Sequence, residues 1–144
     1  MDPRLVELDL AGGGTREVLR QLVARLGEAG IVANTGEAYE RLLEREQVMS
    51  TGIGGGIAIP HARTSEVKST VVALGRSISG VPFDAIDGKP VDVVFLILGS
   101  PDSSAEHVKV LARIARLVKQ KDFHDAALKA ETVEQLLEAV QKYQ

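Results

Sequence analysis

The chain has 144 residues, of which 44% are hydrophobic and 26% charged, and its formal net charge is −3. This length predicts one domain, residues 1–144, whose core is large enough to need neither disulfides nor a structural metal. The weakly acidic charge argues against a nucleic-acid-binding protein, and the absence of cysteine excludes disulfides, thiol chemistry and cysteine-based zinc sites. The N-terminus lacks the apolar run of a signal peptide, and the apolar stretch 93–98 is too short to span a bilayer. We therefore expect a cytoplasmic protein without direct membrane insertion.

The first part of the chain predicts a strand and two helices. Residues 6–10 alternate like a short strand and are followed by three glycines. Thr15 is the expected cap of a first helix and Thr35 that of a second. The apolar positions of the first helix recur with helical spacing, at Leu19, Leu22, Val23 and Leu26.

The second part of the chain alternates buried strands with helices. Residues 70–74 and 91–98 are continuous apolar runs, which is typical of strands that are buried on both faces. The pattern Ser103-x-x-Glu106 predicts a helix that begins with a capping box. A short helix is expected over 123–129, and a last helix opens at Thr132. Helices and buried strands that interleave in this way predict an α/β fold with a mixed sheet.

The stretch from Ser50 to Arg63 carries the strongest functional signal. It reads Ser-Thr-Gly-Ile-Gly-Gly-Gly-Ile-Ala-Ile-Pro-His-Ala-Arg, a glycine-rich turn followed by a short apolar strand, a proline and a histidine. Glycines allow a tight bend with exposed backbone N–H groups, and such a concavity suits an anion. Neutral imidazole is nucleophilic near neutral pH. The sequence therefore suggests that His61 carries a phosphoryl group.

The chain has three histidines, and for each one a functional role is weighed against a purely structural or solvent-exposed one. His61 favours a functional role because it follows the glycine turn at a strand end, where ligands of open α/β sheets tend to lie. His107 falls in the first turn of its helix, where the helix dipole disfavours a charged ring. A neutral ring there could donate a hydrogen bond to a phosphoryl oxygen, or it could simply face solvent. His124 stands in a short polar stretch and is expected to be exposed.

Other site classes fit less well. The histidine spacing does not match a usual zinc site, so no metal is expected. The glycines match neither the dinucleotide fingerprint nor the P-loop. Arg45 precedes the glycine stretch, and arginine is well suited to bidentate contact with phosphate, but a charged triplet at a helix end is usually a solvated surface.

Four segments together resemble the fructose/mannitol-type enzyme IIA family of the bacterial phosphoenolpyruvate-dependent sugar phosphotransferase system. They span residues 43–46, 50–62, 83–91 and 106–112, and the resemblance extends from about Leu5 to Val140. The Gly-x-Gly-Ile-Ala-Ile-Pro-His segment is the specific part. This family often has asparagine where this chain has Gly55, so a side-chain contact there is in doubt. The resemblance implies a mixed sheet with helices on both faces.

The resemblance also implies a role for each matched residue. His61 would be phosphorylated, while His107 and Arg45 would be the second active-site histidine and the active-site arginine. A phosphate-binding loop is expected at four residues before His61, namely Thr51, Gly52, Gly54 and Gly56. Phosphoryl transfer needs mainly alignment and charge stabilisation, so the resemblance calls for no cofactor or metal.

The implied partners are the histidine-containing phosphocarrier protein as phosphoryl donor and a cysteine of enzyme IIB as acceptor, which makes the chain a phosphotransferase component. The alternative is a member that resembles the nitrogen-regulatory branch and acts by phosphorylation-dependent protein binding. A third reading is a structural or anion-binding domain without turnover. The sequence names neither the sugar nor the oligomeric state.

Overall fold

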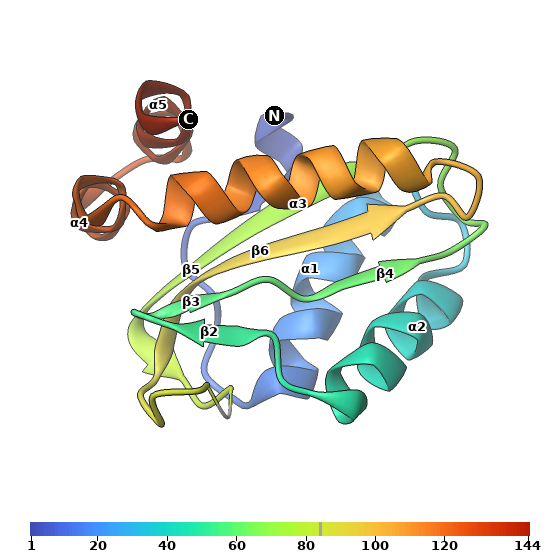
Figure 1. Cartoon of the computed structure of the whole chain (residues 1–144), viewed down its shortest axis with the longest axis horizontal. Coiled ribbons are helices and arrows are strands. Elements are labelled where there is room, and N and C mark those ends of the chain that lie inside the picture. Colours follow the sequence, from blue (N-terminus) through green and yellow to red (C-terminus); the bar gives the residue numbers. More distant parts are fainter. Residues whose placement is uncertain (84) are drawn as a thin grey trace.

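The computed structural model describes residues 1–83 and 85–144, so Asp84 of the 83–91 segment lies outside the described residues. The described residues form a six-stranded sheet that is flanked by helices (Figure 1). The strands are β1 (Val6–Glu7), β2 (Gly52–Gly54), β3 (Ile57–Ala58), β4 (His61–Arg63), β5 (Val71–Val81) and β6 (Val91–Gly99). The helices are α1 (Thr15–Glu28), α2 (Thr35–Val48), α3 (Ser104–Val118), α4 (Lys121–Lys129) and α5 (Val133–Tyr143).

The sheet is mixed, as the sequence predicts. Its order is β1-β5-β6-β3-β2, and β4 pairs with β6 beyond the end of β3. The two long strands β5 and β6 are antiparallel, whereas β1 is parallel to β5, and β3 and β4 are parallel to β6. The register of β4 places His61 opposite Ile97 of β6. His61 therefore lies on an element that is fixed to the centre of the sheet.

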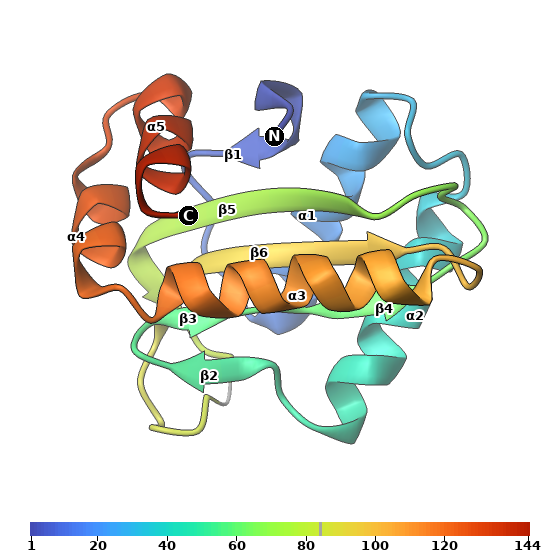
Figure 2. The ribbon, with the colours of Figure 1, turned by 45° about the horizontal axis from the view of Figure 1, so that its top comes forward.

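Two apolar cores lie on opposite faces of the sheet. One packs α1 and α2 against the sheet, and the other packs α3, α4 and α5. Strand β6 alternates between them: Val94 and Leu96 belong to the first core, and Phe95 and Ile97 to the second. Successive strand side chains point to opposite faces, so the continuous apolar run of β6 reflects burial on both sides. Figure 2 shows α3 running along β6, with α4 and α5 beyond its C-terminal end.

The strand predictions are confirmed with two adjustments. Strand β5 continues to Val81, beyond the expected 70–74 run. The N-terminal strand is shorter than the expected 6–10 run and comprises only Val6–Glu7, preceded by a 3-10 helix, Pro3–Leu5, that the Asp2 side chain caps. Among the described residues, no helix is long and apolar enough to cross a membrane.

Two of the four expected N-caps, Thr15 and Thr35, differ in the structure. Gly14, not Thr15, is the N-cap of α1, and the Asn34 side chain, not Thr35, caps α2 by accepting from the Glu37 N–H at 3.0 Å. Ser103 is the N-cap of α3, but its side chain makes no capping hydrogen bond. The expected capping box is absent because the Glu106 carboxylate instead accepts from the Thr70 backbone N–H, across the α3–β5 junction. Thr132 does cap α5, as predicted.

Candidate functional site

His61 is held in one orientation by its own backbone. It is the first residue of β4 rather than the last residue of a strand, because β3 ends at Ala58 and the chain rejoins β6 after Pro60. The His61 Nδ1 atom lies 2.8 Å from the Ile59 carbonyl oxygen. A carbonyl oxygen can only accept, so Nδ1 carries the hydrogen and donates. This leaves Nε2 with a free lone pair, which makes it the nucleophilic atom of the ring.

His107 comes from α3 and lies beside His61. The two ring centroids are 5.9 Å apart and the rings are tilted by 51°. His107 is only 4% exposed, so the solvent-facing alternative is wrong. Its Nδ1 atom is buried and has no hydrogen-bond partner among the described residues. An orphaned buried N–H is disfavoured, which favours the tautomer with the hydrogen on Nε2.

The surroundings of His107 keep its ring neutral. Burial is the largest cause that lowers the pKa of His107 below its ordinary value, followed by the charges of His61 and Arg63. Burial disfavours the charged imidazolium, and neighbouring positive charge acts in the same direction. The sequence reasoning expected a neutral ring from the helix dipole, and the structure adds desolvation as a further cause.

Both imidazoles open onto one shallow pocket of about 570 Å³. Arg45 lines this pocket, and one of its guanidinium nitrogens, Nη1, donates to the Met49 carbonyl at the end of α2 at 2.9 Å. Arg45 is therefore close to both histidines, and its side chain remains partly exposed to solvent. Figure 1 shows that β4, which carries His61, lies between α2, which carries Arg45, and α3, which carries His107. Arg41 and Arg63 also line the pocket together with one acidic residue, Glu44, which pairs with Arg41, so the lining has more cationic than anionic side chains.

Arg63 is a site residue that the sequence reasoning missed. It lines the pocket, and its Nη1 donates to the Ser104 hydroxyl in the first turn of α3 at 2.8 Å. The sequence does contain a signal for Arg63, because residues two apart on a strand share one face. The segment His61-Ala62-Arg63 therefore places the arginine on the same side as the imidazole.

Helix α2 is tied to the chain just after β4. The Thr64 hydroxyl donates to Glu37 at 2.9 Å, and the Asn34 N–H donates to Glu66 at 2.6 Å. A hydrogen bond from Arg41, reinforced by that from Thr64, holds the pKa of the Glu37 carboxyl below its usual range. These contacts fix the α2 arginines relative to His61.

The rim of the pocket is apolar and exposed. Val48 is 81% exposed and Val108 is 58% exposed, and both line the pocket. Leu111 completes this side. Exposed apolar side chains around a polar centre are typical of a surface that binds another protein.

The structure does not bring the expected phosphate-binding loop to the imidazoles. The residues that line the pocket do not include the four loop residues, Thr51, Gly52, Gly54 and Gly56. Two backbone N–H groups of the loop already serve carboxylates of the chain, because Thr51 donates to Glu46 and Gly55 donates to Asp87 at 3.1 Å. The glycines instead form the β2–β3 hairpin, whose turn residues 54–56 have positive φ angles.

His124 differs from the expectation of a merely exposed residue. Its Nε2 lies 2.7 Å from Asp92 Oδ1, and both side chains are largely buried. A Cβ atom at Gly56 would approach both groups to within 3 Å. His124 therefore fastens α4 to the start of β6 and to the hairpin, away from His61.

A family model described as "Phosphoenolpyruvate-dependent sugar phosphotransferase system, EIIA 2" matches residues 1–143. The chain belongs to this EIIA family. It is 35% identical over 133 residues to a nitrogen regulatory protein of Pseudomonas aeruginosa. The matched region covers 92% of this chain and 86% of that protein. It is 33% identical over 139 residues to a fructose-specific EIIABC component of Bacillus subtilis, matching 96% of this chain but spanning only 22% of the relative's length.

Solved structures agree with the fold. The nitrogen regulatory protein IIA-Ntr of Neisseria meningitidis superposes with a TM-score of 0.88 at 30% identity, over 96% of this chain and 94% of that one. The mannitol enzyme IIA of Escherichia coli, solved in complex with phosphorylated enzyme IIB, superposes with a TM-score of 0.82 at 20% identity. That match covers 99% of this chain and 97% of the mannitol protein. The family resemblance and the mixed α/β fold are thus confirmed, and the chain is a component of the phosphotransferase system.

Proposed function

We propose that this EIIA protein carries a phosphoryl group on His61 Nε2, received from the histidine-containing phosphocarrier protein and passed to a cysteine of enzyme IIB. The observation that carries the proposal is the hydrogen bond from His61 Nδ1 to the Ile59 carbonyl at 2.8 Å. It leaves the lone pair of Nε2 free, and His61 lines the same pocket as His107 and the arginines.

Two displacements at phosphorus make up the cycle. In the first, the Nε2 lone pair forms a P–N bond while the P–N bond of the donor phosphohistidine breaks and the donor ring leaves as neutral imidazole. In the second, the IIB thiolate attacks phosphorus, and the P–Nε2 bond breaks to restore neutral His61. Phosphorylated His61 has a ring with positive character that keeps its Nδ1 hydrogen, so the Ile59 carbonyl stabilises the intermediate.

His107 and the arginines supply the charge stabilisation that phosphoryl transfer requires. With its hydrogen on Nε2, the neutral His107 ring donates to a phosphoryl oxygen on its neighbour. Arg45 and Arg63 each have one N–H held by the protein, at Met49 and Ser104, which leaves further guanidinium donors for the phosphoryl oxygens. Because these groups are positioned before the reaction, little reorganisation is needed in the transition state.

The apolar rim at Val48 and Val108 provides the surface on which donor and acceptor proteins dock in turn. The E. coli mannitol enzyme IIA was solved with a phosphorylated enzyme IIB, which supports a IIB partner for this chain. A multiphosphoryl transfer protein of E. coli, of which this chain matches 16% of the length, supports the phosphocarrier protein as donor.

A transfer assay tests the proposal. Purified chain is incubated with phosphoenolpyruvate, the general phosphotransferase proteins and a candidate fructose-type IIB. We expect His107→Ala to accept the phosphoryl group but to pass it on slowly, and His107→Gln to recover part of the rate because its amide still donates. Wild-type transfer by His107→Ala in both directions would contradict the role of His107.

A regulatory function is the second candidate. The match to the P. aeruginosa nitrogen regulatory protein covers 86% of that protein, and the N. meningitidis IIA-Ntr has the same fold. In this case His61 is phosphorylated, but the phosphorylation state controls binding of a target protein through the same rim. Failure of transfer to every IIB tested, together with binding to a target that depends on phosphorylation, favours this candidate over sugar transport.

A further inference from the structure

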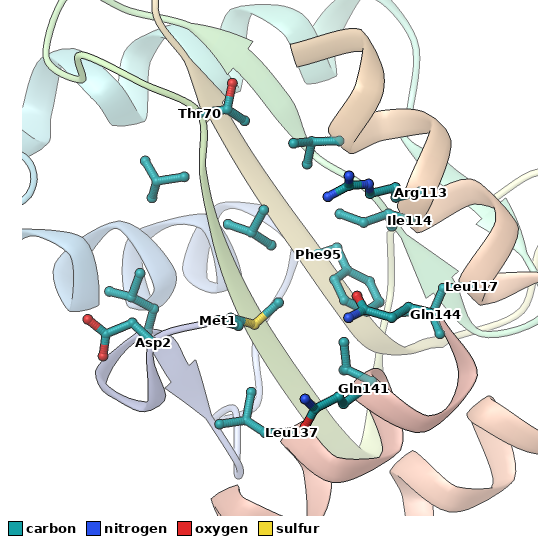
Figure 3. A pocket seen from close by; sticks show the side chains of 15 residues that line it. Met1, Asp2, Thr70, Phe95, Arg113, Ile114, Leu117, Leu137, Gln141 and Gln144 are labelled. Carbon is teal, nitrogen blue, oxygen red and sulfur yellow. The ribbon is translucent and has the colours of Figure 1, made fainter. Parts of the chain in front are cut away.

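A second pocket lies on the α3–α5 side of the sheet, apart from the His61–His107 site. Its volume is about 580 Å³, which falls within the range of about 300–1,000 Å³ that is common for small-molecule sites. It opens where α3, α5 and the N-terminal segment meet one face of β5 (Figure 3). None of its lining residues lines the histidine pocket.

The walls of this pocket are mostly apolar. Phe95 of β6 is fully buried at its base, while Val72 of β5 and Leu137 of α5 are only half-buried and keep apolar surface in contact with water. Helix α3 contributes a continuous apolar face: Val110, Ile114 and Leu117. Transfer of such surface from water to an apolar ligand is favourable. The walls therefore suit the hydrocarbon body of a small molecule.

One arginine, Arg113, lines the pocket and is exposed to solvent. Arg113 extends from α3 toward β5 (Figure 3), and its guanidinium has no hydrogen-bond or ion-pair partner among the described residues. Asp2 is the acidic residue of the lining, but its carboxylate binds Arg4 at 2.8 Å. Figure 3 shows the Asp2 carboxylate directed away from Arg113. A guanidinium with free donors is well matched to a carboxylate.

We propose that this pocket binds a small amphipathic carboxylate, with its hydrocarbon body against Phe95 and the α3 and α5 side chains and its carboxylate on Arg113. The side-chain amides of Gln141 and Gln144 line the same pocket and provide further hydrogen-bond donors. The inference depends on this pocket alone and stands apart from the phosphoryl chemistry. Val110 is three residues after His107 on α3, so a bound ligand contacts the helix that carries the second histidine.

An NMR titration of the full chain with sodium octanoate, kept below its micelle-forming concentration, tests the proposal. Acetate and 1-octanol are the matched probes, since acetate has only the charge and octanol only the hydrocarbon body. We expect saturable shifts of the amide signals of Val72, Ile114 and Leu137 with octanoate. Acetate should leave these signals unchanged, and octanol should bind at least about tenfold more weakly, because it lacks the charge-assisted contact.

Two variants assign the contacts. Arg113→Gln should weaken octanoate binding at least about tenfold while leaving octanol binding unchanged. Arg116→Gln, an exposed arginine one turn further along α3 and outside the lining, is the matched control and should bind octanoate like the wild type. Val110→Phe should fill the pocket and abolish binding of both probes.

Three results would overturn the proposal. One is equal octanoate affinity in the wild type and Arg113→Gln, and another is octanoate shifts at His61 and His107 without shifts in the pocket, which would mean that the anion binds the phosphoryl site. The third is a set of pocket shifts that grow with protein concentration without any ligand, which would assign this face to a second copy of the chain.

Discussion

The Nδ1 atom of His107 lies directly against the backbone of Gly99, the last residue of β6. A Cβ atom at position 99 would overlap with His107 Nδ1 and would also approach Cγ of the ring to 3.1 Å. Gly99 thus lets the imidazole pack onto the sheet beside His61, and it does so through lack of volume rather than through an unusual φ angle. The buried position of His107 depends on this glycine.

We expect Gly99→Ala to displace the His107 ring and to slow phosphoryl transfer to IIB at least about tenfold, because a misplaced donor no longer stabilises the transferring group. Transfer kinetics, with thermal unfolding of the same samples, measure both effects. Gly12→Ala is the matched control, since a Cβ atom there meets no atom within 4 Å. Normal transfer by Gly99→Ala would show that the position of His107 does not matter.

The neutral state of His107 predicts a pH dependence of stability. Its pKa is lowered mainly by burial, below the ordinary value of about 6.5. Between the lowered and the ordinary pKa the unfolded chain binds more protons than the folded one, so the free energy of unfolding falls as pH falls through this window. Urea unfolding of the wild type should therefore lose more stability from pH 7.5 downward than that of His107→Gln. An NMR titration that places the pKa of His107 at or above 6.5 would contradict this expectation.

Arg45 and Arg63, two of the three arginines that line the pocket, should affect transfer more than folding. Arg45→Gln and Arg63→Gln should each slow phosphorylation of the chain by roughly ten- to a thousandfold, because each removes a cation from the developing phosphoryl charge. Both side chains are at the surface, so the free energy of unfolding should change by less than about 1 kcal/mol. Arg116→Gln serves as the control for a loss of positive charge outside the pocket. Transfer rates for Arg63→Gln equal to this control would remove Arg63 from the site.

Arg76 is expected to stabilise the fold without contributing to the chemistry. Its side chain is almost fully buried, and it donates to the Leu8 carbonyl at 3.2 Å, to that of Ala127 at 3.0 Å and to that of Ala130. Arg76→Met leaves these carbonyls without a donor and should lower the free energy of unfolding by about 3 kcal/mol. Urea denaturation measures this, with the exposed Arg16→Met as a control that should change it by less than about 0.5 kcal/mol. Equal stability of the two variants would be the contrary result.

The sequence predicts those features that depend on local pattern. The alternation of Val94, Phe95 and Leu96 between two cores follows from a continuous apolar run, and the helical spacing of Leu19 and Leu22 fixes the buried face of α1. These positions are decided by periodicity, which the sequence carries directly.

One cause of a wrong prediction is competition from a partner that is far away in the sequence. Glu106 would complete a capping box with Ser103, but the Thr70 N–H takes its carboxylate. Anion binding by the glycine turn stays a prediction, and one N–H of the turn, that of Gly55, already donates to the distant Asp87. Such long-range hydrogen bonds cannot be recognised from the local sequence. The position of Arg63 on the same strand face as His61, in contrast, follows from the alternation of side chains along a strand.

The central claim is that His61 Nε2 is the sole phosphorylation site, and intact-protein mass measurement with phosphohistidine NMR tests it most directly. After incubation with phosphoenolpyruvate and the general phosphotransferase proteins, the wild type should gain one acid-labile, base-stable phosphate, bound at Nε2 of His61. His107→Ala and His124→Ala should gain the same phosphate, and His61→Ala should gain none. Full labelling of His61→Ala, or a phosphate on Nδ1 of His61, would contradict the account.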